Sequence, residues 1–210
     1  MRVLVISGLI VLADQISKLA VKGVRVPWLG IEWDGMTYGQ SIPVLGDFFR
    51  LTYIENPGMA FGIDFGGKAF FSILSIAASV AIVLYMMRVR HAPLGFRAAL
   101  SMILGGAVGN LIDRVFYGVL YGEAPLFQGR VVDFFDVDFF NISIGSYHLT
   151  RWPVFNIADA SVTVGVILLL LFHRAIEGNS AGPAVASRAG DTAVASPASP
   201  GPTPGSPTGG

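Results

Sequence analysis

The chain has 210 residues, of which 53% are hydrophobic and 13% charged, and its mean hydropathy is +0.63. Because a soluble domain carries about 25% charged residues, this composition indicates a membrane protein. Fourteen acidic residues balance fourteen basic ones, so the charge suggests neither a nucleic-acid partner nor a polybasic lipid-binding surface. The sequence has no cysteine, which excludes disulfides, thiol nucleophiles and cysteine-ligated metals, and its three histidines lack ligand spacing. We expect no metal and no other cofactor.

Four windows of the sequence are long and apolar enough to cross a membrane, because about 20 apolar residues span the roughly 30 Å hydrocarbon layer. The windows are approximately Val3–Val21, Ala69–Met87, Phe96–Val115 and Val154–Phe172. The first has the arginine and apolar run of a signal peptide, but Asp14 and Lys18 interrupt it and no A-x-A cleavage site follows. We therefore expect an all-α membrane protein with four transmembrane helices.

Basic residues predict the orientation of these spans. The short loop between the second and third windows carries three arginines and no acid, one arginine precedes the first window, and one closely follows the fourth. They are Arg2, Arg88, Arg90, Arg97 and Arg174. Because Lys and Arg concentrate in short cytoplasmic loops, we expect this loop and both termini in the cytoplasm, and the segments 22–68 and 116–153 on the outer side.

The two outer segments contain strand patterns. Residues 48–56, FFRLTYIEN, alternate apolar and polar side chains, and residues 133–144, DFFDVDFFNISI, are rich in Phe, Val and Ile. They predict a small extracytoplasmic β-rich region resting on the membrane. Residues 176–210 are mostly Ala, Ser, Pro and Gly, a composition that cannot bury a core. We expect a membrane domain over residues 1–175 and a disordered cytoplasmic tail over 176–210.

Polar residues inside three of the windows fall at helical spacing, so that those of each window share a helix face. The groups are Asp14 with Lys18, then Asn110 with Asp113 and Arg114, and finally Asn156 with Asp159. In the third window, Gly105 and Gly109 form a small-xxx-small pattern that lets another helix approach closely. Packing explains these glycines, and an ion pair that fixes helix packing is one explanation of Asp14 with Lys18. The other polar faces lie near the outer boundary of the membrane.

One further carboxylate, Asp133, lies in the apolar stretch GRVVDFF, just before the chain returns to the membrane. Partial burial raises the pKa of such a group unless a partner offsets it. If Asp133 meets Asp159, the two acids cannot both ionise comfortably and will share one proton. Such a pair supplies a general acid and a general base in one place.

Five blocks of this sequence resemble, in order, those of the bacterial lipoprotein signal peptidases, the signal peptidase II family. They are DQISK (14–18), NPGMAFG (56–62), GGAVGNLIDR (105–114), GRVVDFF (129–135) and FNIADASVTVG (155–165). The resemblance implies an aspartyl endopeptidase that cuts prolipoproteins just before the lipid-modified cysteine, with Asp133 and Asp159 as its catalytic pair. The positions that match the family's supporting polar residues are Asp14, Lys18, Asn56, Asn110, Asp113, Arg114 and Asn156.

The resemblance also implies where the enzyme works and on what. We expect a multi-pass protein of the bacterial cytoplasmic (inner) membrane, a monomer, with its active site near the outer face. Diacylglyceryl-modified prolipoproteins and membrane lipids are the expected partners. We expect the apolar walls of the second, third and fourth spans to hold the acyl chains of the substrate. We expect Asn56, Asn110 and Asn156 to orient substrate main chain or the aspartates. We expect Arg114 to pair with Asp113, and Asp14 with Lys18 to tie the first span to the others.

Two segments depart from the family pattern, and three other functions compete with this interpretation. Residues 28–41 and 115–132 are longer than the connections expected of many relatives. The family pattern therefore does not predict how substrate reaches the site. A small proton-coupled transporter would also use intramembrane acids, but nearer the midplane and within paired repeats. A non-catalytic assembly protein would not explain Asp133. A serine–lysine peptidase would need Ser17 and Lys18, which are adjacent and lie on different helix faces.

Overall fold

The computed structural model describes residues 2–26, 29–58, 68–138, 142–144, 147–149 and 151–180. The chain divides into two compact units, Met1–Phe172 and His173–Gly210. Of the predicted tail, residues 176–180 continue the last helix, and residues 181–210 lie outside the described residues. The fold that follows is that of the first unit.

The described helices agree closely with the apolar windows. They are α1 (Leu4–Lys22), α2 (Lys68–Arg88), α3 (Leu94–Ile112), a π-helical turn (Asp113–Tyr117), the short α4 (Gly118–Leu120) and α5 (Ile157–Ser180). Three helical stretches within the described residues are long and apolar enough to cross a membrane: Leu4–Lys22, Phe70–Arg88 and Leu94–Leu120. The apolar part of α5, Ile157–Phe172, is shorter. A membrane protein with three long apolar helices is thus confirmed, and the count of four spans stays a prediction.

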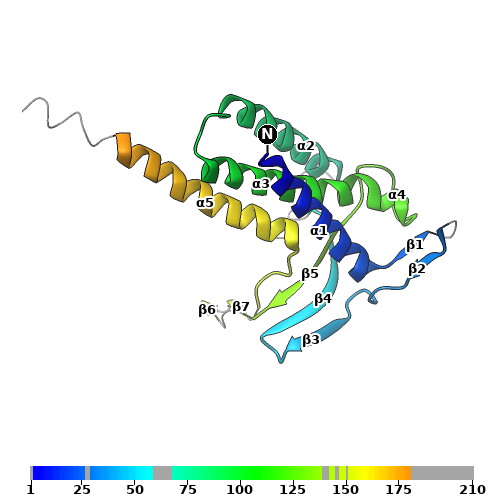
Figure 1. Ribbon diagram of the computed structural model, residues 1–210. Coiled ribbons are helices and arrows are strands. Elements are labelled where there is room, and N and C mark those ends of the chain that lie inside the picture. Colours follow the sequence, from blue (N-terminus) through cyan, green and yellow to red (C-terminus); the bar gives the residue numbers. More distant parts are fainter. Residues whose placement is uncertain are drawn as a thin grey trace, which may run out of the picture. The chain divides into compact units, whose positions relative to one another are not determined.

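Small residues on α3 bring α1 and α5 close to it (Figure 1). A Cβ atom on Gly105 would lie 3.0 Å from the Cβ of Ile10 in α1, and one on Gly106 would lie 2.3 Å from the carbonyl oxygen of Ala158 in α5. Ser7 of α1 donates a hydrogen bond of 2.7 Å to the carbonyl oxygen of Ser101 in α3. Small residues permit such close backbone contact between membrane helices. The predicted packing role is confirmed for Gly105 and also for Gly109, where a Cβ atom would lie 2.7 Å from Asp14 Oδ2 of α1.

The strands within the described residues form three small antiparallel sheets. They are a hairpin of β1 (Val24–Val26) and β2 (Ile31–Trp33), a sheet of β3 (Ser41–Leu45), β4 (Phe49–Asn56) and β5 (Val131–Val137), and a pair of β6 (Ile142–Ile144) and β7 (Tyr147–Leu149). The strand predicted over residues 48–56 is confirmed as β4. The pattern over 133–144 divides between β5 and β6. A β-rich region therefore accompanies the helices.

Strand β5 is nearly buried along its whole length and holds the start of α5 in place. Val132 and Phe134 pack with Val21 of α1 and Tyr53 of β4 in an apolar cluster. Phe135 donates its N–H to the carbonyl oxygen of Phe155 at 2.7 Å, and Phe155 returns an N–H bond to Phe135 at 3.1 Å. This bridge fixes the residues that begin α5 beside the residues of β5.

Candidate active site

Lys18 lies at the centre of the polar residues that the sequence singled out. Its side chain is fully buried, and its ammonium group has three acceptors: Asp14 Oδ2 at 2.8 Å, Asp113 Oδ2 at 2.8 Å and Asn110 Oδ1 at 2.9 Å. An ammonium group has three N–H donors, so each is used. The predicted pairing of Asp14 with Lys18 is confirmed, and Lys18 also joins α1 to α3.

Asp14 links α1 to α5 as well. Its Oδ1 atom accepts the backbone N–H of Ala158 at 2.9 Å. Ala158 lies in the first turn of α5, where backbone N–H groups have no partner within the helix and carry partial positive charge. A buried carboxylate here therefore satisfies a free donor and fixes the position of α5.

Asp113 has the partner Lys18 and does not form the predicted ion pair with Arg114. Its Oδ1 atom accepts from Gln15 Nε2 at 2.9 Å, and its Oδ2 atom accepts the backbone N–H of Val132 at 3.2 Å. Arg114 instead donates through Nη1 to the carbonyl oxygen of Asn110 at 3.3 Å. The expected pairing with Arg114 was wrong because Lys18 reaches the same carboxylate from α1, which helical spacing within one span cannot reveal. Asp113 thus connects α3 with β5.

Asn156 caps the N-terminus of α5. Its Oδ1 atom accepts the N–H of Asp159 at 2.9 Å, and Asp159 Oδ2 accepts the N–H of Asn156 at 3.4 Å. This reciprocal arrangement is a capping box in which Asn and Asp replace the commoner Ser or Thr and Glu. The i, i+3 spacing of Asn156 and Asp159 is therefore a local signal that starts this helix. The same hydrogen bonds fix the Asp159 side chain.

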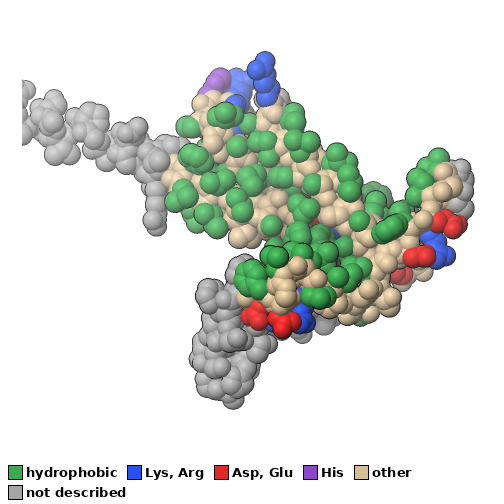
Figure 2. Space-filling view, turned by 60° about the horizontal axis from the view of Figure 1, so that its bottom comes forward, with side chains coloured by type: hydrophobic (Ala, Val, Ile, Leu, Met, Phe, Trp, Pro, Cys, Tyr) green, Lys and Arg blue, Asp and Glu red, His purple; other side chains and the backbone are tan. Residues whose placement is uncertain are grey.

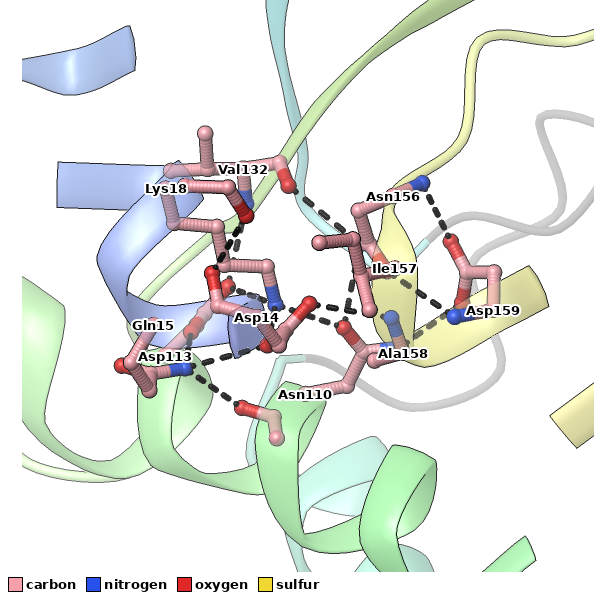
Figure 3. Close-up of polar contacts among 12 residues, drawn as sticks. Asp14, Gln15, Lys18, Asn110, Asp113, Val132, Asn156, Ile157, Ala158 and Asp159 are labelled. Carbon is pink, nitrogen blue, oxygen red and sulfur yellow. Dashed lines mark hydrogen bonds and ion pairs between the residues drawn. The ribbon is translucent and has the colours of Figure 1, made fainter. Parts of the chain in front are cut away.

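Two asparagines connect Asp133 and Asp159. Asn156 donates through Nδ2 to Asp133 Oδ1 at 2.6 Å, and Asn110 donates through Nδ2 to Asp159 Oδ1 at 2.7 Å. The asparagines also contact each other, since Asn156 Nδ2 lies 3.1 Å from Asn110 Oδ1. Figure 3 shows Asn110 between Lys18 and Asp159, with Asn156 at the start of α5. The structure thus brings together Asp14, Lys18, Asn110, Asp113, Asp133, Asn156 and Asp159.

The surroundings of the two aspartates differ. Asp133 is 2% exposed, whereas Asp159 is half-buried. Burial, together with the negative charge of Asp159, raises the pKa of Asp133 to about 7. At neutral pH the pair can therefore hold one proton between a buried carboxyl group and a more accessible one. Chemically, this arrangement provides a proton donor beside a proton acceptor.

Comparison with known proteins gives this arrangement a family. The family model described as Signal peptidase (SPase) II matches residues 6–174. The chain belongs to the signal peptidase II family. Members of this family are aspartic-type peptidases, hydrolases that act on peptide bonds. The family match gives no support to the proton-coupled transporter.

Curated relatives carry the same name. The chain is 34% identical over 167 residues to the lipoprotein signal peptidase of Pelodictyon phaeoclathratiforme, covering 79% of this chain and 86% of the relative. It is 35% identical to that of Porphyromonas gingivalis, covering 80% and 82%. A solved bacterial membrane enzyme structure is 30% identical in sequence and superposes with a TM-score of 0.62. The match covers 87% of this chain and 91% of the solved one. The relatives and the solved structure thus match most of the chain.

Asn56, in the second block shared with signal peptidase II, lies apart from the polar network. It ends β4 opposite Val131, two residues before Asp133 in the neighbouring strand. Its side chain is exposed, and Oδ1 accepts the N–H of Gly58 at 2.9 Å. In this structure Asn56 stabilises a turn, and the rest of its block, residues 59–62, lies outside the described residues.

Gln15 belongs to the network but was not selected from the sequence. Its Nε2 atom donates to the carbonyl oxygen of Gly109 at 3.1 Å and to Asp113, and its Oε1 atom accepts from Tyr117 Oη at 3.1 Å. Gln15 follows Asp14 directly and so lies off the face that Asp14 shares with Lys18. An amide inside an apolar span was nevertheless a signal, because polar groups in membrane helices need partners.

The longer connection 115–132 is tied to α1 and β4 rather than left free. Lys22 at the end of α1 bonds Glu123 at 2.8 Å, pairs with Glu55 of β4, and lies 4.3 Å from the ring centre of Tyr121. Burial alone would raise the pKa of Glu55, but hydrogen bonds from Lys22 and Tyr53 outweigh it and hold that pKa below its usual value. A cavity of about 500 Å³ lies here, and neither Asp133 nor Asp159 is among its lining residues.

No metal ligand set accompanies these carboxylates in the part of the chain that the structure describes. There, no three His, Cys, Asp or Glu side chains are grouped so that they could hold an ion. Asp14 and Asp113 instead neutralise the ammonium group of Lys18. The arrangement is therefore one of hydrogen bonds and a buried ion-pair network around two aspartates.

Proposed function

We propose that this chain is an intramembrane aspartyl endopeptidase that removes signal peptides from prolipoproteins, cutting on the N-terminal side of the diacylglyceryl-modified cysteine, with Asp133 and Asp159 as its catalytic residues. The observation that carries the assignment of these two residues is their joint contact with one pair of asparagines. Asn156 bonds Asp133, Asn110 bonds Asp159, and the two amides bond each other.

In the proposed mechanism the pair holds one proton. Asp133, buried and with its pKa raised to about 7, donates a proton to the scissile carbonyl oxygen, while ionised Asp159 accepts one from the attacking water. A tetrahedral diol forms. When it collapses, the C–N bond breaks, Asp159 gives its proton to the leaving amine, and Asp133 recovers the proton of the hydroxyl group. No covalent acyl-enzyme is formed, so no serine or cysteine nucleophile is needed.

The remaining members of the network act as positioning residues. Asn156 caps α5 and bonds Asp133, so that a single side chain sets the helix that carries Asp159 relative to β5. Lys18 donates to Oδ1 of Asn110, so that the Nδ2 group of the same amide is directed toward Asp159. In a water-poor site, such preorganised groups are held without rearrangement during the reaction.

The proposed setting is a bacterial cytoplasmic membrane crossed by α1, α2, the helix from Leu94 to Leu120, and α5. Both termini would lie in the cytoplasm and the two aspartates near the outer face. Support comes from the arginines between α2 and α3 and from the exposed apolar side chains of α2, which suit acyl chains. Those side chains include Ile73, Leu74, Val80 and Leu84.

The test is cleavage of a diacylglyceryl-modified prolipoprotein by purified wild type, Asp133→Asn and Asp159→Asn. Asparagine keeps the shape of aspartate and removes its titrating group. Each variant should fold and lose at least about 10²-fold in cleavage rate. The matched control is Asp138→Asn, one residue beyond the end of β5, which should cut at the wild-type rate.

Each result bears on one assignment. A folded Asp133→Asn or Asp159→Asn protein with near-wild-type cleavage would remove that residue from the catalytic pair. Wild type that binds but does not cut the substrate would return the non-catalytic assembly function to consideration.

A further inference from the structure

A second cavity lies where the start of α1, the end of α2 and the start of α3 meet. Its volume is about 390 Å³. Five apolar and three basic or imidazole side chains line it: Val3, Leu4, Val83, Met86, Met87, Arg90, His91 and Arg97. None of them belongs to the network of Asp133 and Asp159. Figure 2 shows blue and purple side chains together at one end of the molecule, bordering a green apolar surface.

The part of the molecule around this cavity carries positive charge that nearby acids do not neutralise. The sequence contains no Asp or Glu among residues 1–13 or 65–112. Among the described residues, the ion pairs do not involve Arg88, Arg90 or Arg97. The balanced net charge of the whole chain, which predicted no lipid-binding surface, conceals this local excess.

Arg97 is held at the cavity with part of its guanidinium group unused. Its Nη1 atom donates to the carbonyl oxygen of Arg90 at 2.7 Å, which fixes the end of the side chain. Its Nε atom is buried and lacks a partner within the described residues. Arg90 contacts its neighbour through Nε, which lies 3.1 Å from His91 Nε2. Arg97 lines the cavity, so the N–H groups of its guanidinium that the Arg90 carbonyl does not use are suited to an anionic ligand there.

We propose that this cavity binds one anionic phospholipid, with its phosphate at Arg90, His91 and Arg97 and the first part of an acyl chain along Val83, Met86 and Met87. The planar guanidinium group matches phosphate oxygens in a two-pronged hydrogen bond, and flexible methionines adapt to a mobile chain. Basic pockets between membrane helices are suited to anionic headgroups. A free phosphate ion would leave the apolar wall uncovered, and a zwitterionic lipid would add a cation beside the arginines.

The experiment is a lipid titration of the full-length, delipidated protein in a neutral detergent, followed by native mass spectrometry. Phosphatidylglycerol should give one bound lipid that saturates at a lower concentration than later ones. Phosphatidylcholine and glycerol 3-phosphate are the other arms. If phosphatidylcholine saturates the site at the same concentration as phosphatidylglycerol, the proposed selectivity for anionic lipid is overturned. If glycerol 3-phosphate binds as tightly as phosphatidylglycerol, the role of the acyl chain is overturned.

Variants separate this site from general surface charge. Arg90→Gln and Arg97→Gln should each weaken phosphatidylglycerol binding about fivefold, as expected for one arginine near an anionic headgroup. The matched control is Arg88→Gln, which removes the same charge from the same helix end but does not line the cavity. Equal weakening by Arg88→Gln would overturn the site in favour of diffuse attraction.

A last variant tests the cavity without changing any charge. Val83→Phe places a larger side chain in its wall and should also weaken phosphatidylglycerol binding, while thermal unfolding of the lipid-free protein shows that it is folded. Wild-type affinity in a folded Val83→Phe protein would contradict acyl-chain binding in the cavity.

Discussion

Asp133 and Asp159 have the same side chain in different surroundings, and the proposed mechanism gives them different tasks. Asp133 lies in a strand that is buried on nearly every residue, while Asp159 lies in the first turn of a helix and is half-buried. Burial penalises the charged form of Asp133, and ionised Asp159 penalises it further. These surroundings favour a proton on Asp133, the group that the proposed mechanism uses as its acid.

The pH dependence of cleavage follows from this assignment. The acid must be protonated, and the pKa of Asp133 is raised to about 7. Below pH 7 Asp133 keeps its proton, and above pH 7 it loses it, so both carboxylates are charged and the donor is gone. The cleavage rate at substrate concentrations well below KM, which follows the titration of the free enzyme, should fall about tenfold per pH unit above roughly pH 7, and should recover when the pH is returned to 6. A rate that stays constant up to pH 9 would contradict Asp133 as the acid.

Lys18 is predicted to matter for stability because its ammonium group is buried among three acceptors. Lys18→Met keeps a similar volume but leaves Asp14 and Asp113 without their cation, which should destabilise the protein by about 3–5 kcal/mol. The control is Arg25→Gln, which removes an ion pair with Asp34 whose side chains are 71% and 83% exposed. That change should leave the free energy of unfolding nearly unchanged, because water screens an exposed ion pair. Denaturant unfolding in detergent compares the two, and equal losses would contradict the stabilising role of Lys18.

At the scale of elements, Gly106 of α3 lies against the backbone of α5. A Cβ there would lie 2.3 Å from the carbonyl oxygen of Ala158, a backbone atom that cannot rotate away. Gly106→Ala should therefore move the start of α5, destabilise the protein by about 1–3 kcal/mol and slow cleavage, because α5 carries Asn156 and Asp159. The control is Gly8→Ala in α1, where a Cβ meets no atom within 4 Å.

The outcome for Gly8→Ala should be neutral or slightly stabilising, since alanine favours a helix by up to about 1 kcal/mol. Thermal unfolding and the cleavage assay on the same preparations test both substitutions. If Gly106→Ala cleaves and unfolds like Gly8→Ala, the packing of α3 against α5 does not control the site.

Local patterns predicted the elements well because their causes are local. Apolar length located α1, α2 and α3 within a few residues, and alternation located β4. The π-helical turn Asp113–Tyr117 was not predicted, because contacts from distant residues accompany it. Gly129 donates its N–H to the carbonyl oxygen of Arg114, and Phe127 donates to Val115. A sequence window contains one side of such a contact and not the other.

The same distinction applies to the candidate site. Helical spacing correctly placed Asp14 with Lys18 and Asn156 with Asp159 on common faces. It could not decide which helix supplies the partner of Asp113, where the answer is Lys18 rather than Arg114. Nor could it show that Asn56 would bond its own turn. Pairing across elements depends on how they pack, and only the folded chain contains that information.

At the scale of the whole molecule, basic and acidic side chains are distributed unevenly. Arg88, Arg90 and Arg97 lie in or near the connection between α2 and α3. Figure 2 shows the red acidic side chains away from the cluster of blue and purple side chains at one end. Attraction of basic residues to the cytoplasmic side predicts the orientation of all the helices together. It also predicts that the proposed phospholipid cavity and the two proposed catalytic aspartates lie at opposite leaflets, since Arg97 lies in the first turn of α3 and Asp113 directly follows its last residue.

This orientation can be measured directly because the chain has no cysteine of its own. Glu32→Cys places one exposed thiol on β2, and Pro93→Cys places one between α2 and α3. In spheroplasts, a membrane-impermeant maleimide should label Glu32→Cys at once and Pro93→Cys only after the membrane is permeabilised, because arginines in a short loop favour its cytoplasmic side. In inside-out vesicles the order should reverse. If Pro93→Cys is instead labelled in intact spheroplasts, the aspartates face the cytoplasm, where exported prolipoproteins would not present their cleavage site.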